Sequence, residues 1–217
     1  MFLRVKTRST ENDIVFNTDY NALENAQDQF DGYYVYRVYF DVFAMEEGDI
    51  GKECKEIKVA EFTGTFVDDV RCLNDGVDPF YAADSIDQDV ATAFENLFYR
   101  SRRYKFVSDD DSCVPLVSCY LDRFYVLPEY RGQGIGSYLL KNLDDIIEIN
   151  INRRVWAIVT YPSAFHASDE TYTEEERMKM LRTMKRCFKK AGYKELADTN
   201  YFIKNCSFDR ENKRIES

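Results

Sequence analysis

The chain has 217 residues, a net charge of −10 and one histidine. This length suits a single domain with a substantial core, which we expect to span 1–217. The acidic balance argues against a nucleic-acid partner, because such a partner usually requires a basic face. Most of this charge serves solubility, although it would also suit a cationic acceptor.

The six cysteines form no Cys-x-x-Cys pair, and with a single histidine they predict no dedicated zinc site. No apolar run is long enough to span a bilayer, and the first ten residues lack a secretory apolar region. We therefore expect a cytoplasmic protein with reduced thiols and no membrane partner.

The first third of the chain predicts antiparallel strands. A short strand is expected over 2–7, and a polar stretch with one helix near 19–29 follows. Apolar residues then alternate with mixed ones over 33–43, and a turn at 46–49 leads to a partner strand over 56–67. This pattern predicts a β-hairpin with an aromatic stripe, which is more typical of a core than of a ligand site.

A less regular segment, residues 71–111, separates the hairpin from the next strand. Asp84 or Ser85 can cap a helix whose apolar residues recur at three- and four-residue spacing. We expect this segment to be an insertion that covers the sheet or borders an acceptor site. The three carboxylates at 109–111 lack the spaced ligands of a calcium loop and predict a turn.

The most informative stretch begins as a strand over 116–126 and continues as an amphipathic helix over 135–149. Between them lies a loop with Gly132, Gly134 and Gly136. Glycine allows positive φ and lets a ligand approach the backbone closely. The free N–H groups and the dipole of the following helix favour an anion, most naturally a phosphate or pyrophosphate.

The spacing of the glycines shows which known kind of phosphate-binding loop this segment resembles. The dinucleotide fingerprint fails because the third glycine comes one residue early, and no Gly-Lys-Ser/Thr follows as in a P-loop. The string RGQGIG at 131–136 resembles instead the (Arg/Gln)-x-x-Gly-x-(Gly/Ala) loop of the GCN5-related N-acetyltransferases (GNAT), and VLPEY at 126–130 is also typical of that family. An ordinary strand-to-helix turn with packing glycines is the alternative.

The rest of the chain fits an alternating α/β pattern. The predicted elements are a strand over 153–161, a loop over 162–172, a helix over 173–190, one or two strands over 195–204 and a polar tail over 206–217. Acidic residues at the start of the helix and basic residues near its end complement its dipole. We find no internal repeat.

The resemblance is strongest over 117–203. It implies an α/β fold with a mixed sheet, flanked by helices, whose two central parallel strands splay apart to admit the pantetheine arm of acetyl-CoA. In the family a neutral primary amine attacks the thioester directly in a ternary complex. We therefore expect an N-acetyltransferase with acetyl-CoA as cosubstrate, a small-molecule or protein amine as acceptor, and room for a homodimer. A non-catalytic acyl-CoA sensor or a protein-interaction module on the same fold stays open.

The resemblance also implies which residues hold the cofactor. Main-chain groups at the end of the central strand hold the thioester, N–H groups of the loop contact the pyrophosphate, and Arg131 steadies the loop or reaches the phosphates. The expected cofactor-binding residues are Phe124, Tyr125, Val126, Arg131, Gly132, Gln133, Gly134, Ile135, Gly136 and Ser137.

Three residues are candidates for catalysis. Tyr120 and Asp122 stand where several family members carry a base, and their two-residue spacing predicts one shared strand face. Asp122 is the candidate base, acting through water, and burial would have to raise its pKa; a salt bridge with an arginine is the equally weighted alternative. His166 is the third candidate. Phe188 stands where many members carry the tyrosine that protonates the leaving thiolate, so that acid is missing.

Overall fold

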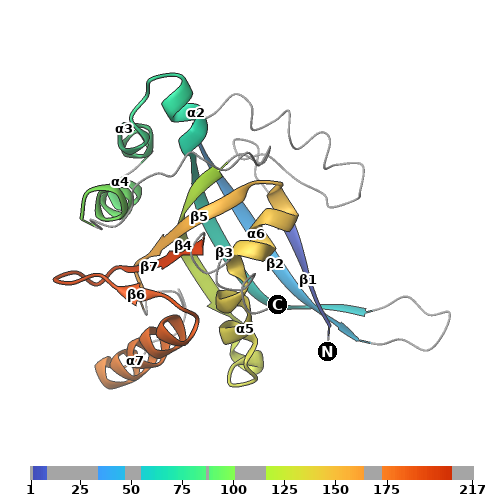
Figure 1. Cartoon of the computed structure of the whole chain (residues 1–217). Helices are drawn as coiled ribbons and strands as arrows, with labels where there is room; N and C mark the ends of the chain where they lie inside the picture. Colours follow the sequence, from blue (N-terminus) through green and yellow to red (C-terminus); the bar gives the residue numbers. More distant parts are fainter. Residues whose placement is uncertain are drawn as a thin grey trace, which may run out of the picture.

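The computed structural model describes residues 2–8, 34–46, 55–86, 88–100, 116–163 and 173–206. These residues form a seven-stranded mixed sheet in the order β1-β2-β3-β4-β5-β7-β6, with helices packed against it (Figure 1). The predicted α/β class is confirmed. Within the described part of the chain, no helix has the length and apolar character that a membrane span needs.

Three antiparallel strands form one side of the sheet. They are β1 (Phe2–Arg8), β2 (Val35–Glu46) and β3 (Lys55–Asp68). The alternating pattern of β2 is confirmed, because Tyr36, Val38, Phe40 and Val42 are all buried. The helix predicted near 19–29 and most of the turn predicted at 46–49 lie outside the described residues, as do the carboxylates at 109–111.

Three short helices and a π-helical turn occupy the segment between β3 and β4, where we predicted one helix. They are α2 (Asp69–Asn74), α3 (Pro79–Asp84), α4 (Gln88–Glu95) and η1 (Asn96–Arg100). Asp84 and Ser85 end α3 instead of capping a helix. The reason is local: Asp78 accepts a hydrogen bond from Phe80 N at 2.8 Å, and Pro79 suits the first helical position.

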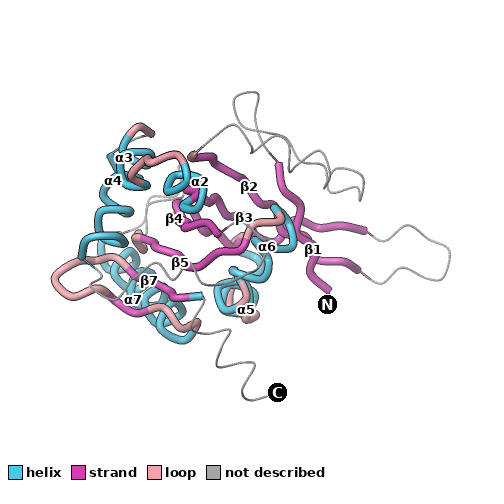
Figure 2. Tube along the Cα trace, turned by 45° about the horizontal axis from the view of Figure 1, so that its top comes forward, coloured by secondary structure: helices cyan, strands magenta, loops and turns pink. Residues whose placement is uncertain are grey.

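These helices cover one face of the sheet, which is one of the two positions that the sequence analysis left open for this segment. Phe94 and Leu97 are completely buried and belong to a cluster that also contains Trp156 and Val159 from the central part of the sheet. Figure 2 shows α2, α3 and α4 grouped together on the side away from α5. The face of β4 and β5 beneath them is therefore closed by packed side chains.

The central strands β4 (Leu116–Val126) and β5 (Arg154–Thr160) run parallel. Their connection contains η2 (Pro128–Tyr130), α5 (Ile135–Lys141) and α6 (Leu143–Ile151). The single helix predicted over 135–149 is therefore divided at Asn142. The side-chain Nδ2 of Asn142 donates to Tyr138 O at 2.8 Å and so competes with the backbone hydrogen bonds of the helix.

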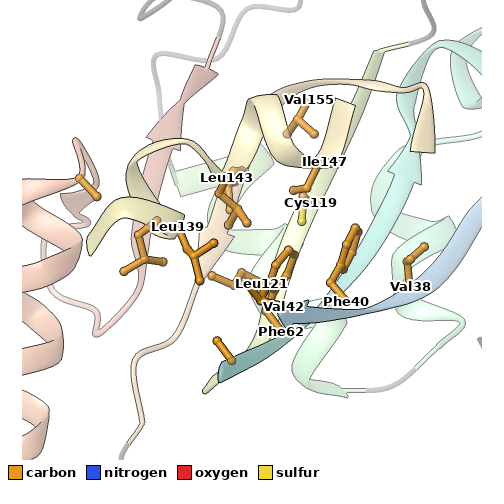
Figure 3. Packing of buried hydrophobic residues seen from close by; sticks show 14 of the residues in the cluster. Val38, Phe40, Val42, Phe62, Cys119, Leu121, Leu139, Leu143, Ile147 and Val155 are labelled. Carbon is orange, nitrogen blue, oxygen red and sulfur yellow. The ribbon is translucent and has the colours of Figure 1, made fainter. Parts of the chain in front are cut away.

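The larger core lies between the sheet and the pair α5 and α6. Leu139, Leu143 and Ile147 point from these helices toward the strands (Figure 3). On the sheet, the rings of Phe40 and Phe62 stack with centroids 4.3 Å apart. The predicted apolar face of the helix is thus the face that holds the glycine loop against the sheet.

Asp144, on α6, is a carboxylate buried in the core. Its Oδ1 accepts a hydrogen bond from Lys204 Nζ at 2.8 Å, while Lys204 is itself only 3 % exposed. The same ammonium donates to Lys141 O at 2.8 Å. A buried carboxylate needs such a partner, and this one lies 60 residues away in the sequence.

The C-terminal part consists of α7 (Glu174–Lys190), β6 (Lys194–Glu195) and β7 (Phe202–Asn205). A capping box starts α7: Thr173 Oγ1 accepts from Glu176 N at 3.3 Å, and the Glu176 carboxylate accepts from Thr173 N at 2.8 Å. The predicted start and end of this helix are confirmed.

Replacing Phe188 by alanine should lower the free energy of unfolding by about 3–5 kcal/mol. The ring is 2 % exposed and lies between Tyr193 and Phe202, with centroid distances of 5.1 and 5.9 Å. Denaturant titration measures the loss, and Met178→Ala on the exposed face of the same helix is the control. Equal losses in the two variants would mean that Phe188 does not occupy the core.

Candidate cofactor-binding site

The pairing between the two central parallel strands ends at one residue pair. Their register ends at Leu121 and Thr160, although β4 continues to Val126. Thr160 is buried, and its Oγ1 donates to Leu121 O at 2.9 Å. The last link between the strands is therefore a side-chain hydroxyl, and β4 is no longer paired with β5 from Asp122 onward.

A β-bulge lies at the same point. On the other side of β4, Thr63 pairs with Arg123 and Gly64 pairs with Leu121, which leaves Asp122 as the extra residue. A bulge bends its strand and re-aims the neighbouring side chains. The end of β4 is thus set apart from β5 and turned at the same residue.

The bulge changes the environment that we expected for the candidate base. Tyr120 is buried and packs in the cluster that contains Trp156, whereas Asp122 is exposed. The two-residue spacing had predicted one shared strand face, but the two side chains lie in different environments. Asp122 therefore lacks the burial that we named as a condition for its role as a base.

Arg131 fastens the glycine loop to the end of β4. Its Nε donates to Val126 O at 2.9 Å, and its guanidinium lies 5.1 Å from the centroid of the Tyr125 ring. Gln133 Nε2 adds a hydrogen bond to Glu129 O at 3.2 Å. These contacts hold the loop in place before any ligand arrives, which reduces the cost of ordering it on binding.

Two glycines of the loop have left-handed backbone conformations. Gly132 has φ 78° and Gly134 has φ 84°, a region that side-chain-bearing residues rarely adopt. No atom lies within 4 Å of the position of a Cβ at either glycine, so space remains for a ligand. At Gly136 a Cβ would be 3.4 Å from Val126 Cγ2, an ordinary contact, and alanine therefore fits.

The start of α5 presents free donors at this loop. The first backbone bond of the helix runs from Tyr138 N to Gly134 O at 2.9 Å, so the N–H groups of Ile135, Gly136 and Ser137 precede the helical ladder. Ser137 Oγ also lies 3.8 Å from Cys187 Sγ on α7. The end of β4, the loop and the first turn of α5 together form one surface with outward-pointing donors.

Two further positions bear on proton transfer, His166 and Phe188. His166 lies outside the described residues. Phe188 is buried in the core, so a hydroxyl at this position would also be buried. Tyr161 is exposed next to Thr160, and its ring meets the ring of Tyr201 edge-on at 5.2 Å. In the part of the chain that the structure describes, no group of three His, Cys, Asp or Glu residues could hold a metal ion.

A buried carboxylate that the sequence analysis missed joins the two central strands from outside the sheet. Asp69, on α2, is 1 % exposed and accepts hydrogen bonds from Ser118 Oγ on β4 at 3.0 Å and from Trp156 Nε1 on β5 at 2.6 Å. These partners lie 49 and 87 residues away, so no local pattern could reveal them. Burial raises the pKa of Asp69 to about 7.

This raised pKa predicts a pH-dependent stability. The pKa of Asp69 rises from 3.8 to about 7 on folding, so the folded protein keeps a proton that the unfolded chain has released. The contribution of Asp69 is therefore fully present below pH 4 and is lost as the pH rises to about 7, by an amount on the order of a few kcal/mol. Asp69→Asn removes this dependence, which denaturant unfolding at pH 5 and pH 8 measures. The control is Asp89→Asn, which changes an exposed carboxylate of α4, and parallel pH curves for Asp69→Asn and the parent would contradict the assignment.

One of the comparisons with known proteins shows the family. A family model described as an acetyltransferase (GNAT) domain matches residues 79–195, which is more than half of the chain. A search of curated proteins found no match. Among solved structures, one described as the crystal structure of a KacTA–DNA complex is similar, with 99 % of each chain covered, a TM-score of 0.38 and 11 % sequence identity. So distant a likeness carries no argument about partners.

Proposed function

Because the chain belongs to the GNAT acetyltransferase family, we propose that it transfers an acetyl group from acetyl-CoA to a primary amine. The observation that carries the proposal is the loop after β4, with left-handed Gly132 and Gly134 and the open N–H groups of α5 behind them. This loop stands at the end of the strand that separates from β5, so a ligand held by its phosphates can direct its acyl end toward the gap in strand pairing.

The residues at the loop fit the cofactor. The N–H groups from Gln133 to Ser137 are proposed to bind the pyrophosphate, where the dipole of α5 also favours an anion. Arg131 is proposed to act mainly through the loop, since its Nε is engaged by Val126 O. Main-chain groups of Phe124, Tyr125 and Val126 are proposed to hold the thioester along the edge of β4 that is no longer paired with β5.

Acetyl-CoA supplies an activated acyl group, and the chain's own residues must orient the amine and remove its proton. Asp122 remains our candidate base, acting through water at the exposed bulge. Tyr120 lies two residues earlier, and His166 follows β5 in the sequence, outside the described residues; both are kept as candidates to support proton transfer. We assign no leaving-group acid, because Phe188 has no hydroxyl and is buried.

One observation favours a second candidate function, an acyl-CoA sensor without turnover. The chain has the buried Phe188 in place of the family's usual acid, while Gly132 and Gly134 keep the left-handed conformations of the proposed phosphate loop. Under this reading the protein would bind acetyl-CoA and release no CoA with any amine. A third reading, a module that only binds a partner chain, requires no cofactor at all.

A two-step experiment tests these readings. Calorimetric titration with acetyl-CoA first asks whether the cofactor binds, and the proposal expects one saturable site. Release of free CoA thiol is then followed with a panel of small amines and lysine-containing peptides. Turnover with any amine above the hydrolysis rate supports the transferase. Binding without turnover supports the sensor, and absence of binding overturns both.

A further inference from the structure

Two tyrosine rings meet just beyond the point where β4 and β5 separate. Tyr161 directly follows Thr160, the last residue of β5 that pairs with β4. Tyr201 lies beside it on β7's side of the sheet, because the next residue, Phe202, pairs with Thr160. The two rings contact edge-on, with centroids 5.2 Å apart, and Tyr161 is 42 % exposed. Aromatic surface is therefore open to a ligand at the edge of the gap between the central strands.

The two rings lie on the opposite side of the sheet from the glycine loop. Tyr201 packs against the core cluster that contains Val90 and Phe94 of α4. Ile135, at the start of α5, belongs to the other cluster, on the side away from α4 (Figure 2). A cofactor on the loop and an acceptor on the rings would therefore reach the gap from opposite sides. This arrangement suits a ternary complex, because neither ligand blocks the entry of the other.

The candidate base lies on the other strand at the same level. Leu121 and Thr160 form the last pair between β4 and β5, so Asp122 and Tyr161 are the first residues beyond that pair on the two strands. Both side chains are exposed. An amine held between the strands would thus have Asp122 on one side and the aromatic pair on the other.

Negative charge lies close to the aromatic pair. Burial first, and then the carboxylate of Asp89 on α4, raises the pKa of the Tyr201 hydroxyl; Tyr161 and Glu95 add smaller contributions. A carboxylate has this effect only when it lies near the hydroxyl, so α4 brings its charge to the pair. Asp89 is exposed, and among the described residues no lysine or arginine forms an ion pair with it. This charge is therefore available to a cationic ligand.

An aromatic face next to a carboxylate favours a cation. The ring attracts an ammonium group through its π electrons, and the attraction grows where water is partly excluded. The net charge of −10 also raises the concentration of cations near the surface. The amine that attacks the thioester must be neutral, so a cation bound at the rings has to be a second group of the same acceptor. A diamine carries both groups.

We propose that Tyr161, Tyr201 and Asp89 form a specificity site for the acceptor, and that this site selects aliphatic diamines and polyamines over monoamines. The assignment rests on the proposed function and concerns the acceptor end of the same site. The neutral nitrogen forms the bond to the acetyl carbon and the C–S bond breaks. The proton that the amine loses balances the proton that the released thiolate gains. The second nitrogen stays protonated on the rings and takes no part in these steps.

Release of free CoA thiol by the full chain, with 1,4-diaminobutane and with butylamine, tests this site. The two amines have the same carbon chain and differ in the second cation. The parent should use the diamine with a kcat/KM at least about tenfold higher, because only the diamine places a cation on the rings. Tyr161→Leu keeps apolar bulk without the ring, so the preference should fall at least about fivefold, mostly through the KM of the diamine. Because preferences are compared between proteins, the different basicities of the two amines in water cancel.

Three further variants separate the causes. Tyr161→Phe keeps the ring without the hydroxyl and should retain the preference. Asp89→Asn removes only the charge and should lower the preference. Tyr81→Leu changes an exposed tyrosine of α3, outside the pair, and should leave kcat/KM for both amines unchanged. Tyr161 and Asp89 are exposed, and thermal melting verifies that each variant is folded.

Other results would overturn the proposal in distinguishable ways. Equal use of the two amines by the parent, an unchanged preference in folded Tyr161→Leu, or an equal loss for both amines removes the specificity site and leaves the transferase intact. A parent that acetylates lysine-containing peptides but no diamine assigns the acceptor to another class, with the same consequence. A parent that binds acetyl-CoA and releases no CoA with any amine removes the proposed function itself, and the specificity site with it.

Discussion

Gly134→Glu is expected to abolish binding of acetyl-CoA. Gly134 has φ 84°, so any side chain strains the loop, and a glutamate adds a negative charge where the pyrophosphate is proposed to sit. Loss of several charge-assisted hydrogen bonds of about 1.5–3 kcal/mol each would move the dissociation constant beyond a calorimetric titration.

Gly136→Ala is the matched control for this loop. Its Cβ would make only ordinary contacts with Val126 and Phe124, at 3.4 and 3.6 Å, and the backbone there is helical. This variant should bind acetyl-CoA nearly as the parent does. Unchanged affinity in a folded Gly134→Glu protein would mean that the loop is not the phosphate site.

Asp122→Asn is expected to lower turnover by about 10²–10⁴ while the affinity for acetyl-CoA stays nearly constant. The substitution preserves shape at the bulge and removes proton acceptance at the point where β4 leaves β5. The deficit should shrink at high pH, because more of the acceptor amine is then already neutral. Steady-state rates between pH 6 and pH 9, with separate binding titrations, measure both effects.

The ion-pair alternative for Asp122 gives a different result. If its carboxylate only stabilises the strand, Asp122→Asn should lower the melting temperature and leave the rate per folded molecule unchanged. Asp198→Asn, an exposed carboxylate in the turn between β6 and β7, controls for a general effect of charge. Full turnover across the pH range, with the parent's affinity, would end the proposal that Asp122 is the base.

The features that sequence alone predicted correctly are those with short-range causes. The apolar pattern placed β2, β3 and β4 within a few residues of their observed ends, and the acidic residues at its start marked the beginning of α7. The glycine loop belongs to the same class, because a left-handed backbone conformation is a property of the residue itself. The family match to residues 79–195 agrees with the resemblance that this loop carried.

Tertiary structure alone decided the features whose partners lie far apart in the chain. The pairs that join Asp69 to Trp156 and Asp144 to Lys204 span 87 and 60 residues. Each buried carboxylate is tolerated only because its hydrogen-bond partner is present, and no local sequence pattern encodes that pairing. The bulge at Asp122 likewise depends on how β3 and β5 pair with opposite edges of β4. Sequence could thus identify the glycine loop, whereas the exposure of the candidate base was set by strand register.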